Sequence, residues 1–302
     1  MRRDQRAELE WPGKRDASGR RREVDPAACL REFALREGWA AGGLLPTPPG
    51  RVLYGDNLAA MAWMLARGEK LGMIYMDPPF NAGRVFRARR EASDGEVEVD
   101  GYDDRWGKGE DSWHHWLWQR LVLARELLDD EGSLFLHIDH RVSADARFLL
   151  DDAFGHDQFR NEIIWSYKSG GASSRHFGRK HDTIFFYSKT DDYYFAPQLE
   201  KSYNRELKQY RFKGVEESCD EVGWHTMVNR RDVWHVDMVG RTSGERVDYP
   251  TQKPVALLDV MMASTRGLVA DFCAGSGVLG ASALAAGRPW TCCDASPLAR
   301  ET

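Results

Sequence analysis

The sequence predicts an α/β fold in which a mostly parallel sheet carries helices on both faces. From residue 51 onward, short apolar stretches alternate with segments of helical spacing, the pattern of an α/β sheet. Residues 71–76 are continuously apolar, as a parallel strand buried on both faces should be. A glycine-rich segment at 271–280 joins a predicted strand to a predicted helix, which is typical of ligand-binding loops in such folds.

The size and composition fit one large α/β domain with an insert, or two small domains. No apolar run approaches the roughly 20 residues that span a bilayer. The first ten residues also lack the apolar stretch of a secretory signal, so we expect a cytoplasmic protein without a membrane partner. The five cysteines are an odd set without Cys-x-x-Cys or zinc spacing, which argues against disulfides and predicts no metal site.

The predicted elements divide the chain into four segments. Residues 1–49 form an N-terminal arm with a short helix at 27–39, and 51–189 form the first part of the main domain. Residues 190–248 are rich in charge and aromatics and lack the strand–helix alternation, so we interpret them as an inserted recognition region. Residues 249–302 complete the domain. The expected strands are 51–54, 71–76, 133–138, 163–167, 183–187, 268–271 and 289–293, and the expected helices are 58–66, 112–129, 142–154, 254–264 and 278–286, with a polar loop at 81–111.

The first candidate motif is Asp77-Pro78-Pro79-Phe80, at the carboxyl end of the strand 71–76. Ligands of open α/β sheets bind outside these strand ends. Two prolines fix the backbone and remove two donors, so the Asp77 carboxylate and the Pro78 carbonyl can act as acceptors beside the Phe80 ring. An exocyclic amino group on a flat base, taken out of its duplex, requires this arrangement. Taken alone, the motif also fits an ordinary strand-ending proline turn.

The second motif is the glycine loop, in which Gly275 and Gly277 precede a helix. The helix start favours a carboxylate, and Asp271 at the strand end could hold an ammonium group, so a methionine-derived cofactor fits both. Gly275, Gly277 and Gly280 also satisfy G-x-G-x-x-G, with Asp294 near the place of a ribose-binding acid, so a nicotinamide enzyme is the rival. Asp271 argues against a nicotinamide enzyme, because its carboxylate would repel the pyrophosphate of that cofactor.

Weaker signals surround these motifs. Lys253 stands at a predicted helix start and could pair with the cofactor carboxylate, or be an ordinary surface lysine. Asp56 follows the strand 51–54 and could accept from the amino group of an adenine. Two runs of cations stand out against the net charge of −5 and predict contacts with DNA phosphates. They contain Arg84, Arg87, Arg89 and Arg90 in one run, and Lys168, Arg175, Arg179 and Lys180 in the other.

Five segments together resemble the β group of bacterial DNA amino-methyltransferases, whose motif order is permuted. They are LYGDNL (53–58), MDPPFN (76–81), HDTIFFYSK (181–189), YPTQKP (249–254) and DFCAGSG (271–277). The resemblance implies a Rossmann-like methyltransferase sheet, S-adenosyl-L-methionine as the cofactor, and target recognition by residues 190–248. One departure is the loop sequence Asp-Phe-Cys-Ala, where Asp-Pro-Phe-Cys or Asp-Phe-Phe-Ala is commoner.

The resemblance also assigns roles to residues. It gives base binding and catalysis to Asp77, Pro78, Pro79 and Phe80. It gives the cofactor site to Asp56, Asp77, Lys253, Asp271, Phe272, Ala274, Gly275, Gly277 and Asp294.

The expected reaction is direct methyl transfer to the N6 amino group of adenine in double-stranded DNA. An exocyclic amine is itself the nucleophile, and the chain has no Pro-Cys dipeptide of the kind that carbon-5 cytosine enzymes use. In the family, Asp-Pro-Pro-Phe goes mostly with adenine. Cytosine N4 is the alternative, and a silent DNA-binding subunit is a more remote one. A homodimer and a cognate restriction enzyme remain open as partners.

Overall fold

The computed structural model describes residues 9–11, 13–31, 50–92, 95–108, 112–168, 172–240, 242–247 and 249–301. Part of the predicted arm packs on the main body. Trp11 is buried, with its ring 5.9 Å from that of Trp118, and Arg21 forms an ion pair with Asp152. The predicted helix at 27–39 begins as α1 (Pro26–Arg31), and its remainder lies outside the described residues.

The main sheet confirms the predicted α/β class. Its order is β1-β13-β12-β2-β5-β7-β6-β11, and every pair of neighbours is parallel except those that involve β7. The strands are β1 (Gly50–Tyr54), β2 (Leu71–Met76), β5 (Leu128–Ile138), β6 (Phe159–Ser166), β7 (His181–Ser188), β11 (Val233–His235), β12 (Val269–Asp271) and β13 (Trp290–Asp294). The strand predicted at 133–138 therefore starts five residues earlier, at Leu128.

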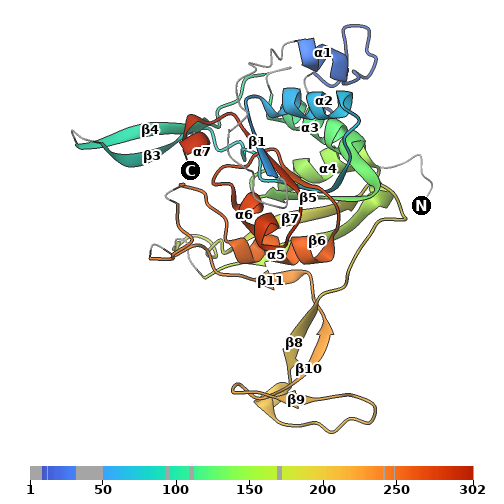
Figure 1. The fold of residues 1–302 in the computed structure, drawn as a ribbon, viewed down its shortest axis with the longest axis vertical. Coiled ribbons are helices and arrows are strands. Elements are labelled where there is room, and N and C mark those ends of the chain that lie inside the picture. The colour runs from blue at the N-terminus through green and yellow to red at the C-terminus, as the bar shows by residue number, and fades with distance from the viewer. Residues whose placement is uncertain are drawn as a thin grey trace.

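Helices cover both faces of this sheet (Figure 1). Successive strand residues point to opposite faces, so β2 sends Ile74 and Met76 into one core and Met73 and Tyr75 into the other. The first core lies against α2 (Asn57–Ala66), α3 (Trp113–Leu127) and α4 (Ser143–Phe154), and the second against α5 (Val255–Ser264) and α6 (Val278–Ala285). The short helix α7 (Pro297–Glu301) contacts β4.

The permuted order is visible in the sheet. Although β1 precedes the other sheet strands in the chain, it pairs with β13, the last strand, in the register Tyr54↔Asp294. The Gly55 amide donates to the Asp294 carbonyl at 3.0 Å. Asp56 and Asp294 therefore follow neighbouring strands at the same edge, as the permuted arrangement requires.

The prediction of a polar loop at 81–111 was wrong in its central part. Residues there form an antiparallel hairpin of β3 (Val85–Ala92) and β4 (Gly95–Asp103) that extends to one side of the body (Figure 1). The signal was present in the sequence, because Val97 and Val99 alternate with charged residues. The high charge of the segment obscured this period-2 pattern.

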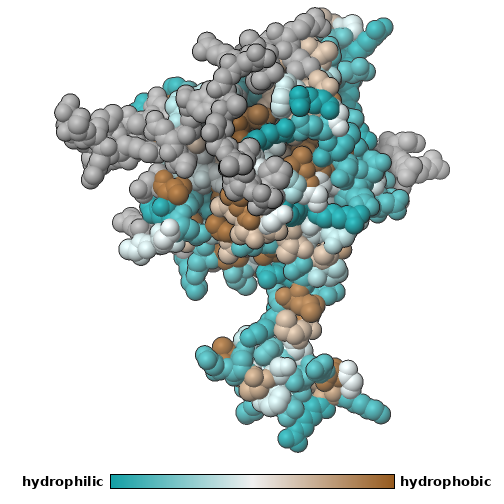
Figure 2. Space-filling view, in the orientation of Figure 1, coloured by the Kyte–Doolittle hydropathy of each residue, from teal (hydrophilic) through white to brown (hydrophobic). Residues whose placement is uncertain are grey.

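The segment 190–248 is divided between two structures. β8 (Leu199–Tyr203), β9 (Ser218–Cys219) and β10 (Trp224–Asn229) form a separate antiparallel sheet, which Figures 1 and 2 show as a largely hydrophilic lobe on a narrow neck. β11 instead joins the main sheet beside β6. Two single turns of 3-10 helix, His156–Gln158 and Arg205–Leu207, complete the described elements. No helix in the described ranges is long and apolar enough to cross a membrane.

Candidate active site

A cavity of about 570 Å³ opens at the carboxyl edge of the parallel strands. The segments after β1, β2, β12 and β13 all contribute to its lining, together with the hairpin β3–β4 and the residues before α5. Several segments that are distant in sequence meet here because the carboxyl ends of parallel strands share one edge. Of the residues predicted to bind base or cofactor, the cavity lining contains Asp56, Asp77, Pro78, Pro79, Phe80, Lys253, Asp271, Phe272, Ala274, Gly275 and Asp294. Gly277 is not among the lining residues, and it caps the following helix.

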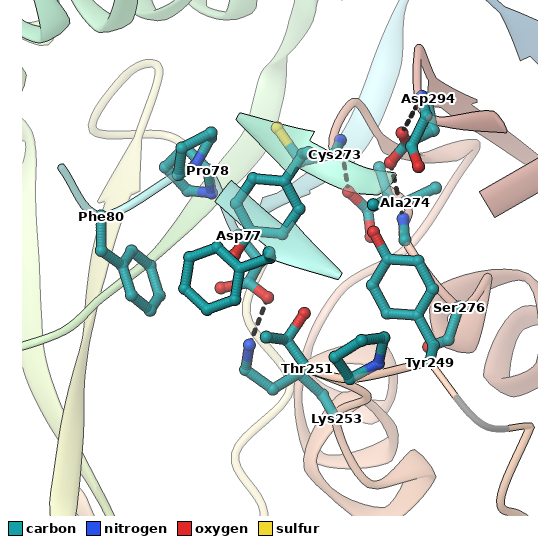
Figure 3. A pocket seen from close by; sticks show the side chains of 18 of the residues that line it. Asp77, Pro78, Phe80, Tyr249, Thr251, Lys253, Cys273, Ala274, Ser276 and Asp294 are labelled. Atoms are coloured by element: carbon teal, nitrogen blue, oxygen red, sulfur yellow. Dashed lines mark hydrogen bonds and ion pairs between the residues drawn. The ribbon is translucent and has the colours of Figure 1, made fainter. Parts of the chain in front are cut away.

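The Asp77 carboxylate has two unlike oxygens. Oδ2 forms an ion pair with Lys253 Nζ, and the two side chains point toward one another in Figure 3. Oδ1 is buried and has no hydrogen-bond partner among the described residues. A buried acceptor without a donor is unfavourable by about 1–3 kcal/mol. Asp77 lines the cavity, and Oδ1 is the oxygen of this carboxylate that still lacks a donor within the described ranges.

The turn that carries Asp77 is anchored from two sides. Trp113 Nε1 donates to the Pro79 carbonyl at 2.6 Å, and Trp113 is fixed at the start of α3, whose N-cap is Ser112. Asp104, fully buried, accepts from the amides of Asn81 at 2.9 Å and Ala82 at 2.7 Å. Sequence reasoning missed Asp104, since it is one acid among many between 94 and 104 and no local pattern marks it as an anchor.

A chain of polar side chains lies under Phe80. The Tyr75 hydroxyl is 2.8 Å from His137 Nδ1, and His137 Nε2 is 3.2 Å from Asp182 Oδ2. The Phe80 and His137 rings are 6.1 Å apart, and Trp165 meets His137 edge-on at 5.3 Å. Burial raises the pKa of Asp182, but the interactions with His137, together with the charge of Lys253 and the Tyr167 hydrogen bond, bring this pKa below its ordinary value. The floor of the cavity is therefore aromatic, with an anionic edge.

The glycine loop is shaped by its neighbours. The Gly275 amide donates to Asp294 Oδ2 and the Ser296 amide to Asp294 Oδ1, both at 2.8 Å. Gly275 has φ 49° and a Cβ there would lie 3.0 Å from the Tyr249 ring, so both conformation and space favour glycine. Gly277 has φ 73° and is the N-cap of α6. Figure 3 shows Tyr249 beside this loop; the sequence contained it in the motif 249–254, but no role had been predicted for it.

Asp271 and Asp294 make this end of the cavity acidic. Asp271 is 1% exposed, and its Oδ1 accepts from the Cys273 amide at 2.9 Å. Burial, together with the charges of Asp77 and Asp294, raises the pKa of Asp271 well above its usual range, and burial also raises the pKa of Asp294. Buried carboxyl groups near one another favour a cationic ligand.

Two predicted cofactor residues have structural contacts as well. Asp56 Oδ1 accepts from the first amides of α2, and its Oδ2 pairs with Arg120 Nη2 at 2.8 Å. The Phe272 side chain is buried in the hydrophobic core, while its carbonyl accepts from Asn57 at 2.7 Å. Both residues line the cavity, so the contacts fix its wall.

The predicted DNA-contacting cations lie on two segments. Arg84 lines the cavity with its guanidinium 4.6 Å from the Phe86 ring, and Arg87 is exposed on β3. The side chains of Arg89 and Arg90 lie outside the described residues. In the second run Lys168 pairs with Asp237 at 3.3 Å, Arg175 and Arg179 are exposed, and Lys180 is half-buried. Within the described ranges, no group of His, Cys, Asp or Glu has the arrangement of a metal site.

Comparison with known proteins gives the family. The model of the N6_N4_Mtase family, described as DNA methylase, matches residues 71–301. The chain belongs to this family of DNA methylases. It is 31% identical over 154 residues to the type II methyltransferase M.EcaI of Enterobacter cloacae, covering 51% of this chain and 32% of that protein. It is 27% identical over 249 residues to the DNA adenine methyltransferase YhdJ of Escherichia coli K12, covering 78% and 75%.

A third relative is the Mod subunit of the type III restriction-modification enzyme EcoP15I of Escherichia coli, 29% identical over 157 residues. The chain spans only 32% and 24% of the lengths of M.EcaI and this Mod subunit. Among solved structures, the M1.HpyAVI–SAM complex matches with a TM-score of 0.52 and 13% identity over 83% of this chain and 98% of that chain. The cytosine-N4-specific PvuII DNA methyltransferase matches with a TM-score of 0.54 and 14% identity over 83% of each chain. These two structures confirm the fold.

Proposed function

We propose that this protein transfers the methyl group of S-adenosyl-L-methionine to the N6 amino group of adenine in DNA. The observation that carries the proposal is that Asp77 lines the cavity with one carboxylate oxygen, Oδ1, buried without a donor in the described part of the chain while Oδ2 is held by Lys253. An exocyclic amine supplies the missing donor, and Phe80 beside it supplies a stacking surface. The adenine methyltransferase YhdJ, with which most of the chain aligns, supports adenine as the base.

The residues of the cavity fit the cofactor. S-adenosyl-L-methionine is cationic at its sulfur and ammonium groups, and the buried carboxyl groups of Asp271 and Asp294 provide the complementary charge. Asp294 holds the glycine loop through Gly275 and stands where ribose hydroxyls can donate to it. We assign Lys253, which also pairs with Asp77, to the cofactor carboxylate. When bound, the cofactor supplies an electrophilic methyl group.

The reaction needs little from the chain besides position and charge. Phe80 holds the plane of the extruded base, and Asp77 Oδ1 accepts a hydrogen bond from its amino group. That bond favours a tetrahedral nitrogen whose lone pair is available for attack, and it places a carboxylate where the nitrogen must later lose a proton. Trp113 and Asp104 keep the turn rigid, since a misplaced acceptor loses most of this effect.

Replacing Asp77 with Asn tests the proposal. Asparagine keeps the size and one acceptor but loses the charge, so we expect methyl transfer to fall by at least about 100-fold while calorimetry still detects cofactor binding. The exposed Asp130, which pairs with Lys189 on the surface, provides the control Asp130→Asn with unchanged activity. Activity close to that of the wild type in Asp77→Asn would contradict the catalytic role.

The base itself is identified by mass spectrometry of nucleosides from DNA methylated by the purified protein. N6-methyldeoxyadenosine is the expected product. N4-methyldeoxycytidine would support the cytosine alternative, which the Asp-Pro-Pro-Phe sequence disfavours. If no methylated nucleoside forms, the chain is a silent DNA-binding subunit.

The same proposal includes the role of the lobe, the location of the protein and its protein partners. We propose that the lobe of β8, β9 and β10 reads the DNA sequence, and that the protein acts in the cytoplasm on chromosomal DNA. The EcoP15I Mod subunit among its relatives supports a cognate restriction enzyme as a partner. Resistance of DNA from expressing cells to that enzyme tests this pairing, and sedimentation with and without DNA tests whether two copies associate.

A further inference from the structure

One aromatic side chain has no place in the mechanism above. Phe177 is 98% exposed, more than any other large apolar side chain of the described residues. It does not line the cavity, so it cannot stack on the base that Phe80 receives. A single exposed apolar ring is common on protein surfaces, so what it indicates depends on the chemistry of the residues around it.

Phe177 lies in a stretch of the sequence that is rich in cations. No acidic residue occurs between 168 and 181, in a chain whose net charge is −5. Arg175 and Arg179 flank the ring at two positions on either side, and both are exposed. An exposed aromatic ring between arginines fits a nucleic acid, because phosphates meet the guanidinium groups and bases stack on the ring.

The segment is also in the right place. It connects β6 to β7, and the pairings Ser166↔His181 and Ile138↔Thr183 put both of its ends at the carboxyl edge of β5 and hence of β2. Trp165 and Asp182, at these ends, line the cavity. The segment therefore leaves the main sheet at the edge where the cavity opens.

Hydrogen bonds connect described residues within this segment. The Tyr167 amide donates to the Lys180 carbonyl at 3.0 Å and closes its base. The Arg175 amide donates to Ser173 Oγ at 3.1 Å, and His176 Nδ1 donates to the Phe177 carbonyl at 2.9 Å. Phe177 is thus exposed on a segment whose two ends lie at the cavity edge.

We propose that Phe177 inserts into the DNA duplex and fills the space that the target base leaves when it enters the cavity. The inference rests on the proposed function, because it requires a base to leave the duplex. The physical reason is stacking: an extruded base leaves its neighbours unstacked, and an aromatic ring in the gap restores that contact and stabilises the open state. Phe177 is a positioning residue, since it touches the DNA but not the reacting atoms.

The test uses the full-length protein and a duplex that contains a site identified by sequencing methylated DNA. In single-turnover assays we expect Phe177→Ala to slow methylation of the paired duplex about tenfold, the effect of losing one aromatic stack. On the same duplex with an abasic position opposite the target adenine, opening is already favoured, so the variant should come within about twofold of the wild type. Phe177→Trp should keep the wild-type rate on both duplexes.

The control is Phe148→Ala, which removes another exposed phenylalanine, on α4, and should change neither rate. With 2-aminopurine at the target position, Phe177→Ala should also reduce the fluorescence increase on binding, while its cofactor affinity stays unchanged. This signal reports base extrusion and a merely structural defect would not change it selectively.

Several results would contradict the role proposed for Phe177. A wild-type rate for Phe177→Ala on the paired duplex overturns the inference, as does an equal loss on both duplexes. A change in sedimentation of Phe177→Ala without DNA would mean that the ring contacts a second copy, which also overturns it. If the wild type methylates no DNA, the proposed function fails first and the inference falls with it.

Discussion

At the residue scale, the candidate site is defined by carboxyl groups that are expensive to bury. Asp271 is nearly inaccessible, and its raised pKa shows that the folded state disfavours its charge. Asp77 keeps one oxygen without a donor. Groups with such unfavourable environments persist in binding sites because a ligand later compensates them.

Asp271→Asn should therefore bind the cofactor more weakly and be more stable than the wild type. Asparagine retains an acceptor for the Cys273 amide and cannot ionise, so we expect the apo protein to gain roughly 1 kcal/mol or more of unfolding free energy at neutral to alkaline pH. Cofactor affinity should fall at the same time. Thermal unfolding and calorimetric titration measure the two effects.

The dependence of the unfolding free energy on pH tests the sign of the stability effect. Because the folded-state pKa of Asp271 lies above its unfolded value, ionisation of this carboxyl group destabilises the fold. The penalty is complete above the folded pKa, shrinks as pH falls below it, and is absent below the unfolded pKa. The stability difference between Asp271→Asn and the wild type should therefore narrow on acidification. A difference that widens would show that the charge stabilises the fold.

At the scale of elements, the hairpin β3–β4 joins the cavity to the surface. Its base lines the cavity through Arg84, Phe86 and Tyr102, and Phe86 stacks on Tyr102 at 4.7 Å. Burial, followed by the charge of Asp77, raises the pKa of Tyr102. We propose that this hairpin, whose base lines the cavity and whose strand β3 carries the exposed Arg87, holds the DNA backbone near the target base.

Changing Arg84, Arg87, Arg89 and Arg90 to Gln should weaken DNA binding and flatten its salt dependence. Each lost phosphate contact should reduce the slope of log affinity against log salt by about 0.9. Fluorescence anisotropy at several salt concentrations measures the slope. Arg125→Gln, on α3, is the matched control and should leave the slope unchanged. An unaltered slope in the quadruple variant would exclude the hairpin as a phosphate contact.

At the scale of the whole molecule, the cavity and the lobe are built by separate sheets. The neck of the lobe is closed by a hydrogen bond from the Arg230 amide to the Gln198 carbonyl at 2.7 Å. Residues 199–229 therefore leave and re-enter the body at adjacent points, and they contain none of the cavity-lining residues. Under the proposed role of the lobe, we expect that DNA recognition and methyl transfer can change independently.

Replacing residues 199–229 with a two-residue glycine turn should leave the main sheet folded and cofactor binding intact. Site-specific methylation should be lost, because the lobe would no longer contact the DNA. Calorimetry and sequencing of methylated DNA measure the two properties. Retention of the same methylated sequence after this deletion would locate recognition in the main body.

The sequence by itself determined the parallel sheet, its flanking helices and the motifs Asp77-Pro-Pro-Phe80 and 271–277, because local apolar periodicity and short-range backbone chemistry encode them. It failed for the hairpin, where charge obscured alternation, and for Asp104 and Tyr249, whose partners are distant in the chain. Only the tertiary structure decided that Lys253 pairs with Asp77 across 176 residues, that β11 joins the main sheet, and that Phe177 remains uncovered. These features depend on which strand ends meet at one edge, and no local sequence pattern specifies that meeting.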